Sequence, residues 1–281
     1  MDKAKRNRYI VAGISFVVIL AAIYLLFIFQ GGPKEPKNNG DVTEVKAVTE
    51  LDIAQRPYVT LTPTSDGAEI IVSMENMGAF DKIEYELTYL ADNPQVAGEK
   101  IQRGATGTDV NTKDAKYKKD VLLGTASRGV KSPDRAIEDG KLLMHMFKSD
   151  IQYDSETEWS LVELGTKAQE ITDKSGNLKF NSPAFTKEYW AILADTVGVP
   201  PKAEFDVKNA LLPTYGIFSI APKFTKKAQL SLKVEKDGNY TLYLYHPNDS
   251  TWGKSDSKYN KNTQTLTSQV EFFSSFVVVS Q

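Results

Sequence analysis

The stretch from Tyr9 to Phe29 contains no charged residue and is dominated by Ile, Val, Leu, Phe and Ala. As an α-helix its twenty-one residues would extend about 30 Å, the thickness of the hydrocarbon core of a bilayer. Such a run must be helical in lipid, because each backbone amide needs a hydrogen-bond partner and water is absent. The sequence therefore predicts a membrane-spanning helix over residues 9–29.

Basic residues on one side of this segment predict its orientation. The preceding residues 1–8 include four basic side chains, Lys3, Lys5, Arg6 and Arg8, whereas Lys34 and Lys37 on the far side are offset by Glu35. Because a basic flank stays in the cytoplasm, residues 1–8 form a cytoplasmic tail and the rest is exported. The alternative is a cleaved signal peptide, which would have a shorter apolar core and a small-residue cleavage site; the sequence Phe27–Gln30 supplies none.

Composition excludes several classes of function. The chain has no cysteine, which excludes disulfides, thiolate metal sites, iron–sulfur clusters and a cysteine nucleophile. Its 34 basic and 36 acidic residues give a net charge of −2, so no basic patch predicts nucleic-acid binding. Hydrophobic residues make up 41% of the chain and charged residues 25%, as in chains that bury a core.

Residues 30–55 are predicted to be a flexible linker, because Gly, Pro and Asn interrupt any periodicity there. From residue 56 to 164 the pattern is that of strands: in Glu84–Tyr89, acidic or hydroxyl side chains alternate with apolar ones. About six or seven such strands predict an antiparallel sandwich that generically resembles immunoglobulin or fibronectin type III domains. The charged, Gly-rich and apolar-poor stretch 97–119 is expected to form a long exposed excursion.

Residues 165–281 are predicted to form a second sandwich domain, which makes the fold class all-β. Residues 170–173 and 177–180 flank Lys174-Ser175-Gly176 and predict a hairpin. A short amphipathic helix is expected after Ser182, which suits an N-cap, with Pro183 at the first helical position and Gly198 at its end. Its apolar stripe would consist of Phe185, Tyr189, Leu193 and Val197.

Three runs in the second domain carry a family resemblance. A proline–aromatic run over 222–232 precedes a tyrosine-rich strand and tryptophan hairpin over 240–252, and the chain closes with Phe272-Phe273-Ser274-Ser275-Phe276. This order resembles the β-sandwich module of ankyrins, netrin receptors and many bacterial surface proteins. Some members of that family cut their own backbone before the serine of a His-Phe-Ser strand.

The resemblance places Ser274 at the nucleophile position and Phe273 before the scissile bond. The base that should take the serine proton would be a histidine where this chain has Phe272, and a phenyl ring cannot accept a proton. We therefore predict an inactive, structural closing strand. A fragment of about eight residues lost from the C-terminus on a denaturing gel would contradict this.

Other chemistry is scarce in the sequence. His145 lies among apolar residues and His246 precedes a proline at a strand end, and neither has the neighbours of a catalytic triad. No phosphate-binding loop occurs. Oxygen-rich loops around 109–114 and 248–256 lack the spacing of a calcium-binding EF-hand, so we predict no cofactor and no metal site, with calcium left open.

Aromatic side chains give the one candidate binding surface. Tyr243 and Tyr245 share a strand face by the period of two, and Trp252 and Tyr259 follow. Such residues bind glycans or peptides, or fill sandwich cores.

Together these features predict a non-enzymatic, single-pass surface protein of the cell membrane. Residues 9–29 are expected to lie in the lipid bilayer, and the exported domains are expected to bind an unknown protein or glycan. The alternative is an accessory subunit of an envelope-spanning assembly, such as a pilus or secretion apparatus, whose anchor packs against partner helices.

Overall fold

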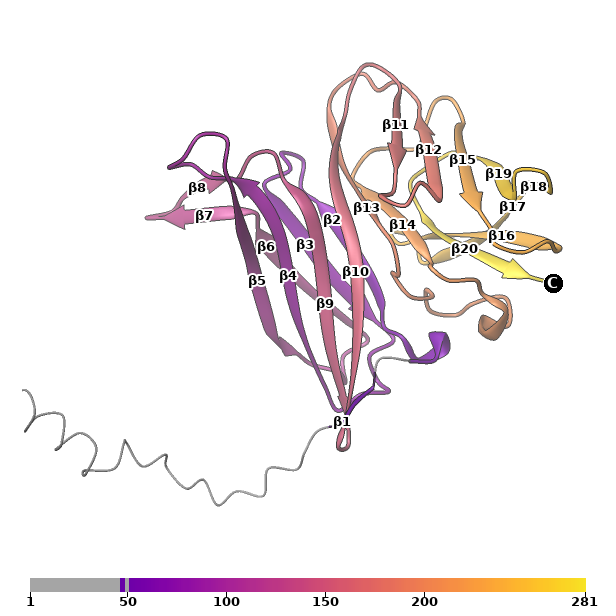
Figure 1. Cartoon of the computed structure of the whole chain (residues 1–281), viewed down its shortest axis with the longest axis horizontal. Coiled ribbons are helices and arrows are strands. Elements are labelled where there is room, and N and C mark those ends of the chain that lie inside the picture. The colour runs from indigo at the N-terminus through magenta and orange to yellow at the C-terminus, as the bar shows by residue number, and fades with distance from the viewer. Residues whose placement is uncertain (1–45, 49–50) are drawn as a thin grey trace, which may run out of the picture. The chain divides into compact units, whose positions relative to one another are not determined.

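The structure is a computed structural model that describes residues 46–48 and 51–281 (Figure 1). The predicted cytoplasmic tail, the membrane-spanning helix over 9–29 and most of the predicted linker lie outside these residues. Within the described part, no helix has the length and apolarity that a membrane span requires. The only helices there are two short 3-10 turns, η1 (Ile53–Gln55) and η2 (Val207–Asn209), so the prediction of an all-β fold with antiparallel sheets is confirmed for that part.

A ten-stranded sheet runs through the described chain. Its strand order is β17-β16-β20-β14-β13-β10-β9-β4-β5, and the short β1 lies parallel to the start of β10. The strands are β1 (Lys46–Val48), β4 (Lys82–Asp92), β5 (Lys100–Val110), β9 (Glu138–Lys148), β10 (Ile151–Leu164), β13 (Tyr189–Ala194), β14 (Tyr215–Ser219), β16 (Tyr240–His246), β17 (Thr251–Ser255) and β20 (Ser275–Ser280).

Two smaller sheets and a hairpin complete the fold. The three-stranded sheet has the order β2-β3-β6, and the five-stranded sheet has the order β11-β12-β15-β19-β18. The hairpin pairs β7 with β8. Their strands are β2 (Tyr58–Pro63), β3 (Glu69–Glu75), β6 (Lys116–Leu122), β7 (Gly124–Ser127), β8 (Val130–Pro133), β11 (Gln169–Thr172), β12 (Leu178–Ser182), β15 (Ala228–Lys233), β18 (Ser257–Asn260) and β19 (Thr265–Val270).

The two smaller sheets cover opposite faces of the ten-stranded sheet. The first core joins β2, β3 and β6 to inward residues of the large sheet that include Tyr85, Met144 and Trp159. Figure 1 shows β2, β3 and β6 behind the long strands β4, β9 and β10. The second core joins the five-stranded sheet to other residues of the large sheet, among them Leu193 and Phe276. Each half is thus a two-layered β structure around its own core.

Strand β13 shows how one strand serves both cores. Ile192 and Ala194 belong to the first core, whereas their neighbours Ala191 and Leu193 belong to the second. Successive side chains of a strand point to opposite faces, so covers on opposite faces bury every position. Strands buried on both faces are continuous apolar runs rather than alternating ones.

The helix predicted after Ser182 is wrong, because this segment contains strand β13. The spacing of Phe185, Tyr189, Leu193 and Val197 matches a helical stripe, but the intervening residues 190–192 are also largely apolar and buried. An apolar run of this length fits a buried helix and a doubly buried strand equally well. The excursion predicted over 97–119 is mostly exposed, as expected, but it consists of regular strands that the sequence did not predict, β5 and the start of β6.

Several local predictions are confirmed. The hairpin over 170–180 is formed by β11 and β12, in register at Ile171 and Phe180. The alternation over 84–89 lies within β4. The predicted domain boundary at residue 164 coincides with the end of β10, but the large sheet continues across it from β10 to β13, so the division into two domains stays a prediction. Part of the predicted linker over 30–55 contains β1 and η1.

Candidate binding site

Three of the four predicted aromatic residues lie together on β16 and β17. Tyr245 is paired with Trp252 across the two strands, with ring centroids 5.1 Å apart. Tyr243 lies 6.4 Å from the Trp252 ring. Tyr259 lies elsewhere, on β18, where it contacts Tyr240 and donates a hydrogen bond to Asp237 at 2.9 Å.

The protein's own β13–β14 loop covers this aromatic group. Phe205 from that loop lies 4.6 Å from the Tyr243 ring and 5.1 Å from the Trp252 ring, measured between centroids. The Trp252 indole donates a hydrogen bond to the Pro201 carbonyl at 3.0 Å. Tyr245 is only 1% exposed. These rings therefore mainly hold the loop against the sheet, which makes them a poor platform for a sugar ring.

Two of the three self-cleavage-like residues, Phe273 and Ser274, lie in the interior just before β20, whereas Phe272 is partly exposed. Ser274 is fully buried, and its hydroxyl donates to the Tyr245 carbonyl at 2.8 Å. Phe273 packs among Phe180 and Phe224 in the second core. Phe272 contacts the ring of His246, whose pKa is lowered by burial. The absence of self-cleavage stays a prediction.

His145 lies on the outward face of β9, not in the core among its apolar sequence neighbours. Its Nδ1 is 2.8 Å from Asp154 Oδ1 on β10 and 3.2 Å from Gln152 Nε2. The pKa of Asp154 is lowered: burial acts in the opposite direction but is outweighed by the hydrogen bonds of Gln152 and His145. Local sequence predicted the strand correctly, and the pairing of β9 with β4 and β10 shows which face of the sheet His145 occupies.

The outward side of β4, β9 and β10 forms a surface that we call the open sheet face. The three-stranded sheet covers the other side of these strands, and the five-stranded sheet packs against the large sheet only from the end of β10 onward. Paired residues form four rows across the strands: Lys82, Phe147 and Gln152; Glu84, His145 and Asp154; Glu86, Leu143 and Glu156; and Thr88, Lys141 and Glu158.

Charged side chains surround two apolar ones on this face. Leu143 and Phe147 are half-buried although none of the described strands covers them. Lys82 pairs with Glu84 at 2.8 Å and lies over the Phe147 ring, 5.2 Å from its centroid. Lys141 pairs with Glu156 at 2.7 Å. The face thus carries two separate apolar side chains among ordered charges, with the polar row of Glu84, His145 and Asp154 between them.

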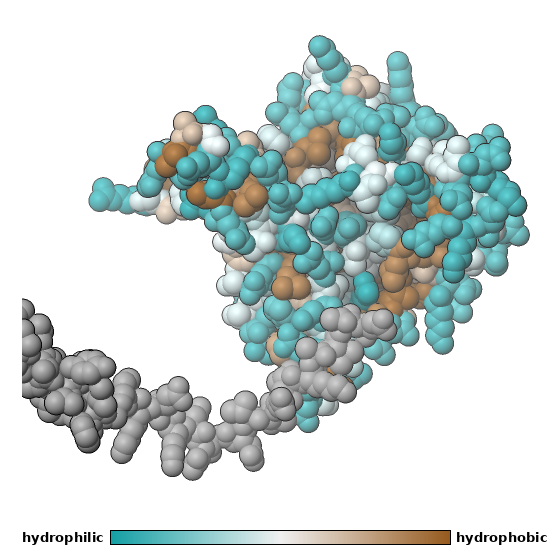
Figure 2. All heavy atoms as spheres, in the orientation of Figure 1, coloured by the Kyte–Doolittle hydropathy of each residue, from teal (hydrophilic) through white to brown (hydrophobic). Residues whose placement is uncertain are grey.

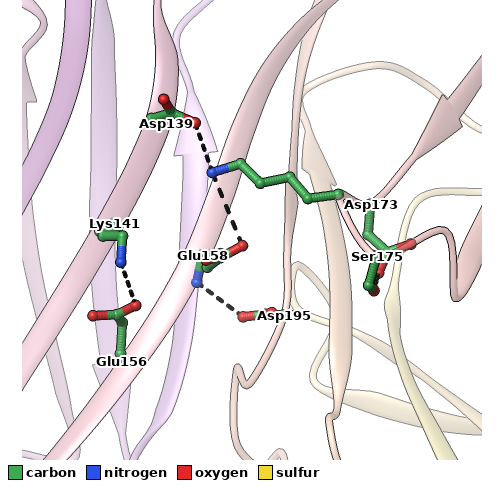
Figure 3. Close-up of polar contacts among 8 residues, drawn as sticks. Asp139, Lys141, Glu156, Glu158, Asp173, Ser175 and Asp195 are labelled. Atoms are coloured by element: carbon green, nitrogen blue, oxygen red, sulfur yellow. Dashed lines mark hydrogen bonds and ion pairs between the residues drawn. The ribbon is translucent and has the colours of Figure 1, made fainter.

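A polar corner lies where the open sheet face meets the β11–β12 hairpin (Figure 3). Lys174 from the hairpin turn contacts Asp139 at 2.8 Å and Glu158 at 3.9 Å. Asp195, just after β13, accepts a hydrogen bond from the Glu158 backbone N–H at 2.9 Å. A cavity of about 380 Å³ in this corner is lined by these groups, except Asp139, and by Asp173, Ser160 and Leu193.

Asp195 is the carboxyl group of the corner whose charged form is disfavoured. Burial raises its pKa, and the nearby carboxylates of Glu158 and Asp173 add to the effect, against the hydrogen bond from Glu158 N–H. Asp139 shows the opposite behaviour, because Lys174 lowers its pKa. Within residues 46–48 and 51–281, no three His, Asp or Glu side chains are grouped as a metal ion would require.

We expect Asp195→Asn to stabilise the protein at pH 7. The folded-state pKa of Asp195 lies above its unfolded-state value, so the unfolded state loses this proton at lower pH and stability falls as pH rises between the two pKa values. Asparagine keeps an acceptor for the Glu158 N–H and removes the buried charge. The free energy of unfolding should rise by about 0.5–2 kcal/mol at pH 7.

Denaturant unfolding at two pH values checks this expectation. At pH 3, below the ordinary carboxyl pKa, the gain should vanish because both states are protonated. Asp139→Asn is the matched control and should not stabilise at either pH. A gain for Asp195→Asn that is equal at pH 3 and pH 7 would contradict the buried-charge explanation.

Comparison with known proteins gives no further information about this site. No family model matches the chain, and no match is found among curated proteins. The resemblances of the two halves to ankyrin-type and immunoglobulin-like modules therefore stay predictions. The residues that sequence reasoning missed are those of the open sheet face, because alternation predicts strands but not which face another sheet covers.

Proposed function

We propose that this chain is a non-enzymatic, membrane-anchored surface protein that binds another protein through its open sheet face. The observation that carries the proposal is the pair of apolar side chains, Leu143 and Phe147, within a charged face that no described strand covers. Half-buried apolar side chains among ordered charged groups offer a partner both apolar area to bury and charges to pair with. The apolar run over residues 9–29 supports the anchor.

A protein partner is better supported than a glycan. Glycan sites depend on exposed aromatic ring faces, and those of Tyr243 and Trp252 contact Phe205. The non-enzymatic character is supported by the surroundings of the histidines in the described part. His145 hydrogen-bonds to Asp154 and Gln152, with no hydroxyl nucleophile in this set. Ser274 is buried with its hydroxyl bonded to a backbone carbonyl.

Site-specific photo-crosslinking on intact cells tests the proposal. A photoreactive phenylalanine analogue placed at Leu143 should give one discrete adduct on a denaturing gel. The same analogue at Ser231, on the outer face of the five-stranded sheet, is the matched control and should give none. Glu86 is the exposed neighbour of Leu143 on β4. The variant Glu86→Lys reverses the charge beside Leu143 and should weaken the Leu143 adduct by disturbing charge pairing with the partner.

Equal adducts from Leu143 and Ser231, or none from Leu143, would overturn the proposal. Adducts formed only from positions within residues 9–29 would instead favour the accessory-subunit alternative, in which the anchor helix contacts partner helices.

A further inference from the structure

A separate cavity opens at one end of the C-terminal half, between the large sheet and the five-stranded sheet. Its volume is about 560 Å³, within the range of roughly 300–1,000 Å³ typical of small-molecule sites. It is lined by residues just before β14, by the end of β15 and by β20. Neither the aromatic group nor the open sheet face contributes to it.

The floor of this cavity is apolar. Tyr215, Leu232, Val234, Phe276 and Val278 line it, and each is less than 9% exposed as a whole residue. Leu212 at the edge is 53% exposed, so an apolar side chain stands at the opening. Unfilled apolar space inside a protein forfeits packing contacts, so an apolar ligand chain would be favoured here.

The rim carries two lysines that are free to meet an anion. Lys233 and Lys236 line the cavity, and neither forms an ion pair with another described residue. Of the rim acids, Asp237 is held by Lys261 at 2.9 Å and by the Tyr259 hydroxyl, and its pKa is lowered by the Lys261 contact. Glu235 is the remaining acid, so positive charge is in excess at the opening.

We propose that this cavity binds an anionic amphiphile with a single apolar chain, such as a long-chain carboxylate. The chain lies between the sheets on Leu232 and Phe276, and the carboxylate lies at the rim near Lys236. The apolar floor, the cationic rim and a volume typical of small-molecule sites support this class of ligand. The cavity is separate from the protein interface proposed above.

Photoaffinity labelling of the full chain in phosphatidylcholine nanodiscs tests this site. Palmitate with a diazirine near its chain end is added, and labelled peptides are mapped by mass spectrometry. We expect adducts on peptides that contain Leu232 or Phe276, lost in excess unlabelled palmitate. In a second arm the diazirine chain is carried by phosphatidylcholine in the nanodisc, and labelling in both arms identifies the bilayer as a source of the chain.

Two exposed variants separate binding from folding. Lys236→Glu should raise the palmitate concentration needed for half-maximal labelling by about fivefold, equivalent to about 1 kcal/mol. Lys258→Glu, on the exposed face of β18, is the matched control and should leave it unchanged. Labelling spread over the surface without competition, labelling by phosphatidylcholine alone, or equal labelling of the two variants would overturn the proposal.

Discussion

Replacing either Ile192 or Leu193 with alanine is expected to lower the free energy of unfolding by about 2–5 kcal/mol, although the two residues are adjacent. Ile192 is fully buried in the first core, and Leu193 is 3% exposed in the second. Each truncation leaves a cavity on a different face of β13. Because the same ten-stranded sheet carries both cores, both variants should unfold in a single transition at lower denaturant.

Urea unfolding followed by tryptophan fluorescence and by circular dichroism measures this effect. Thr88→Ala on the open sheet face is the control and should stay within about 0.5 kcal/mol of the parent. If β13 were the helix that its apolar spacing suggests, only Leu193 would belong to the apolar stripe and Ile192 would tolerate truncation. A small effect of Ile192→Ala, or two separate transitions, would contradict the shared sheet.

The second large effect is expected at Trp159, where alanine should cost about 3–5 kcal/mol. This side chain is 2% exposed and lies beside Tyr89, with ring centroids 6.1 Å apart. Gly140 on the neighbouring strand makes room for it, since a Cβ there would come within 2.3 Å of the indole. The site is therefore filled by one large ring, and its loss cannot be compensated by small shifts.

Trp159→Phe is the informative partner of this variant. The indole N–H has no hydrogen-bond partner among the described residues, so phenylalanine loses ring volume but no hydrogen bond. We expect it to cost less than half of the Trp159→Ala effect in the same unfolding experiment. Equal losses for the two variants would contradict the account that ring volume stabilises this site.

Local patterns predicted the strands that face water on one side. The alternation around Tyr85 and the turn between β11 and β12 are signals within a few residues, and both are confirmed. The prediction for the segment of β13 was wrong because burial on both faces removes the alternation of apolar and polar residues. Strand β5 and the start of β6 were not predicted, because their many polar and glycine residues give too little apolar periodicity; pairing with β4 and β3 supplies the order instead.

The candidate sites depend on contacts that local sequence does not contain. Tyr245 and Trp252 could be grouped because a short hairpin joins them, but Phe205 comes from a loop 38 residues before Tyr243. The open sheet face depends on which face the three-stranded sheet covers, and the corner brings Lys174 to Asp139 across the fold. Such long-range placement follows from sheet packing, not from residue spacing.

Protease accessibility in intact cells tests the central claim, a surface protein whose folded part lies outside the cytoplasm. The β7–β8 hairpin offers an insertion point, because Ser127 to Val130 are all exposed and no residue of β7 or β8 belongs to either core. The hairpin projects from the sheets in Figure 1, and Figure 2 shows the same end of the molecule standing out from the rest of the surface. A recognition site for a sequence-specific protease inserted between Arg128 and Gly129 should be cut when the protease is added to intact cells. A site that stays uncut in intact cells, yet is cut after lysis, would place this part of the protein in the cytoplasm and contradict the account.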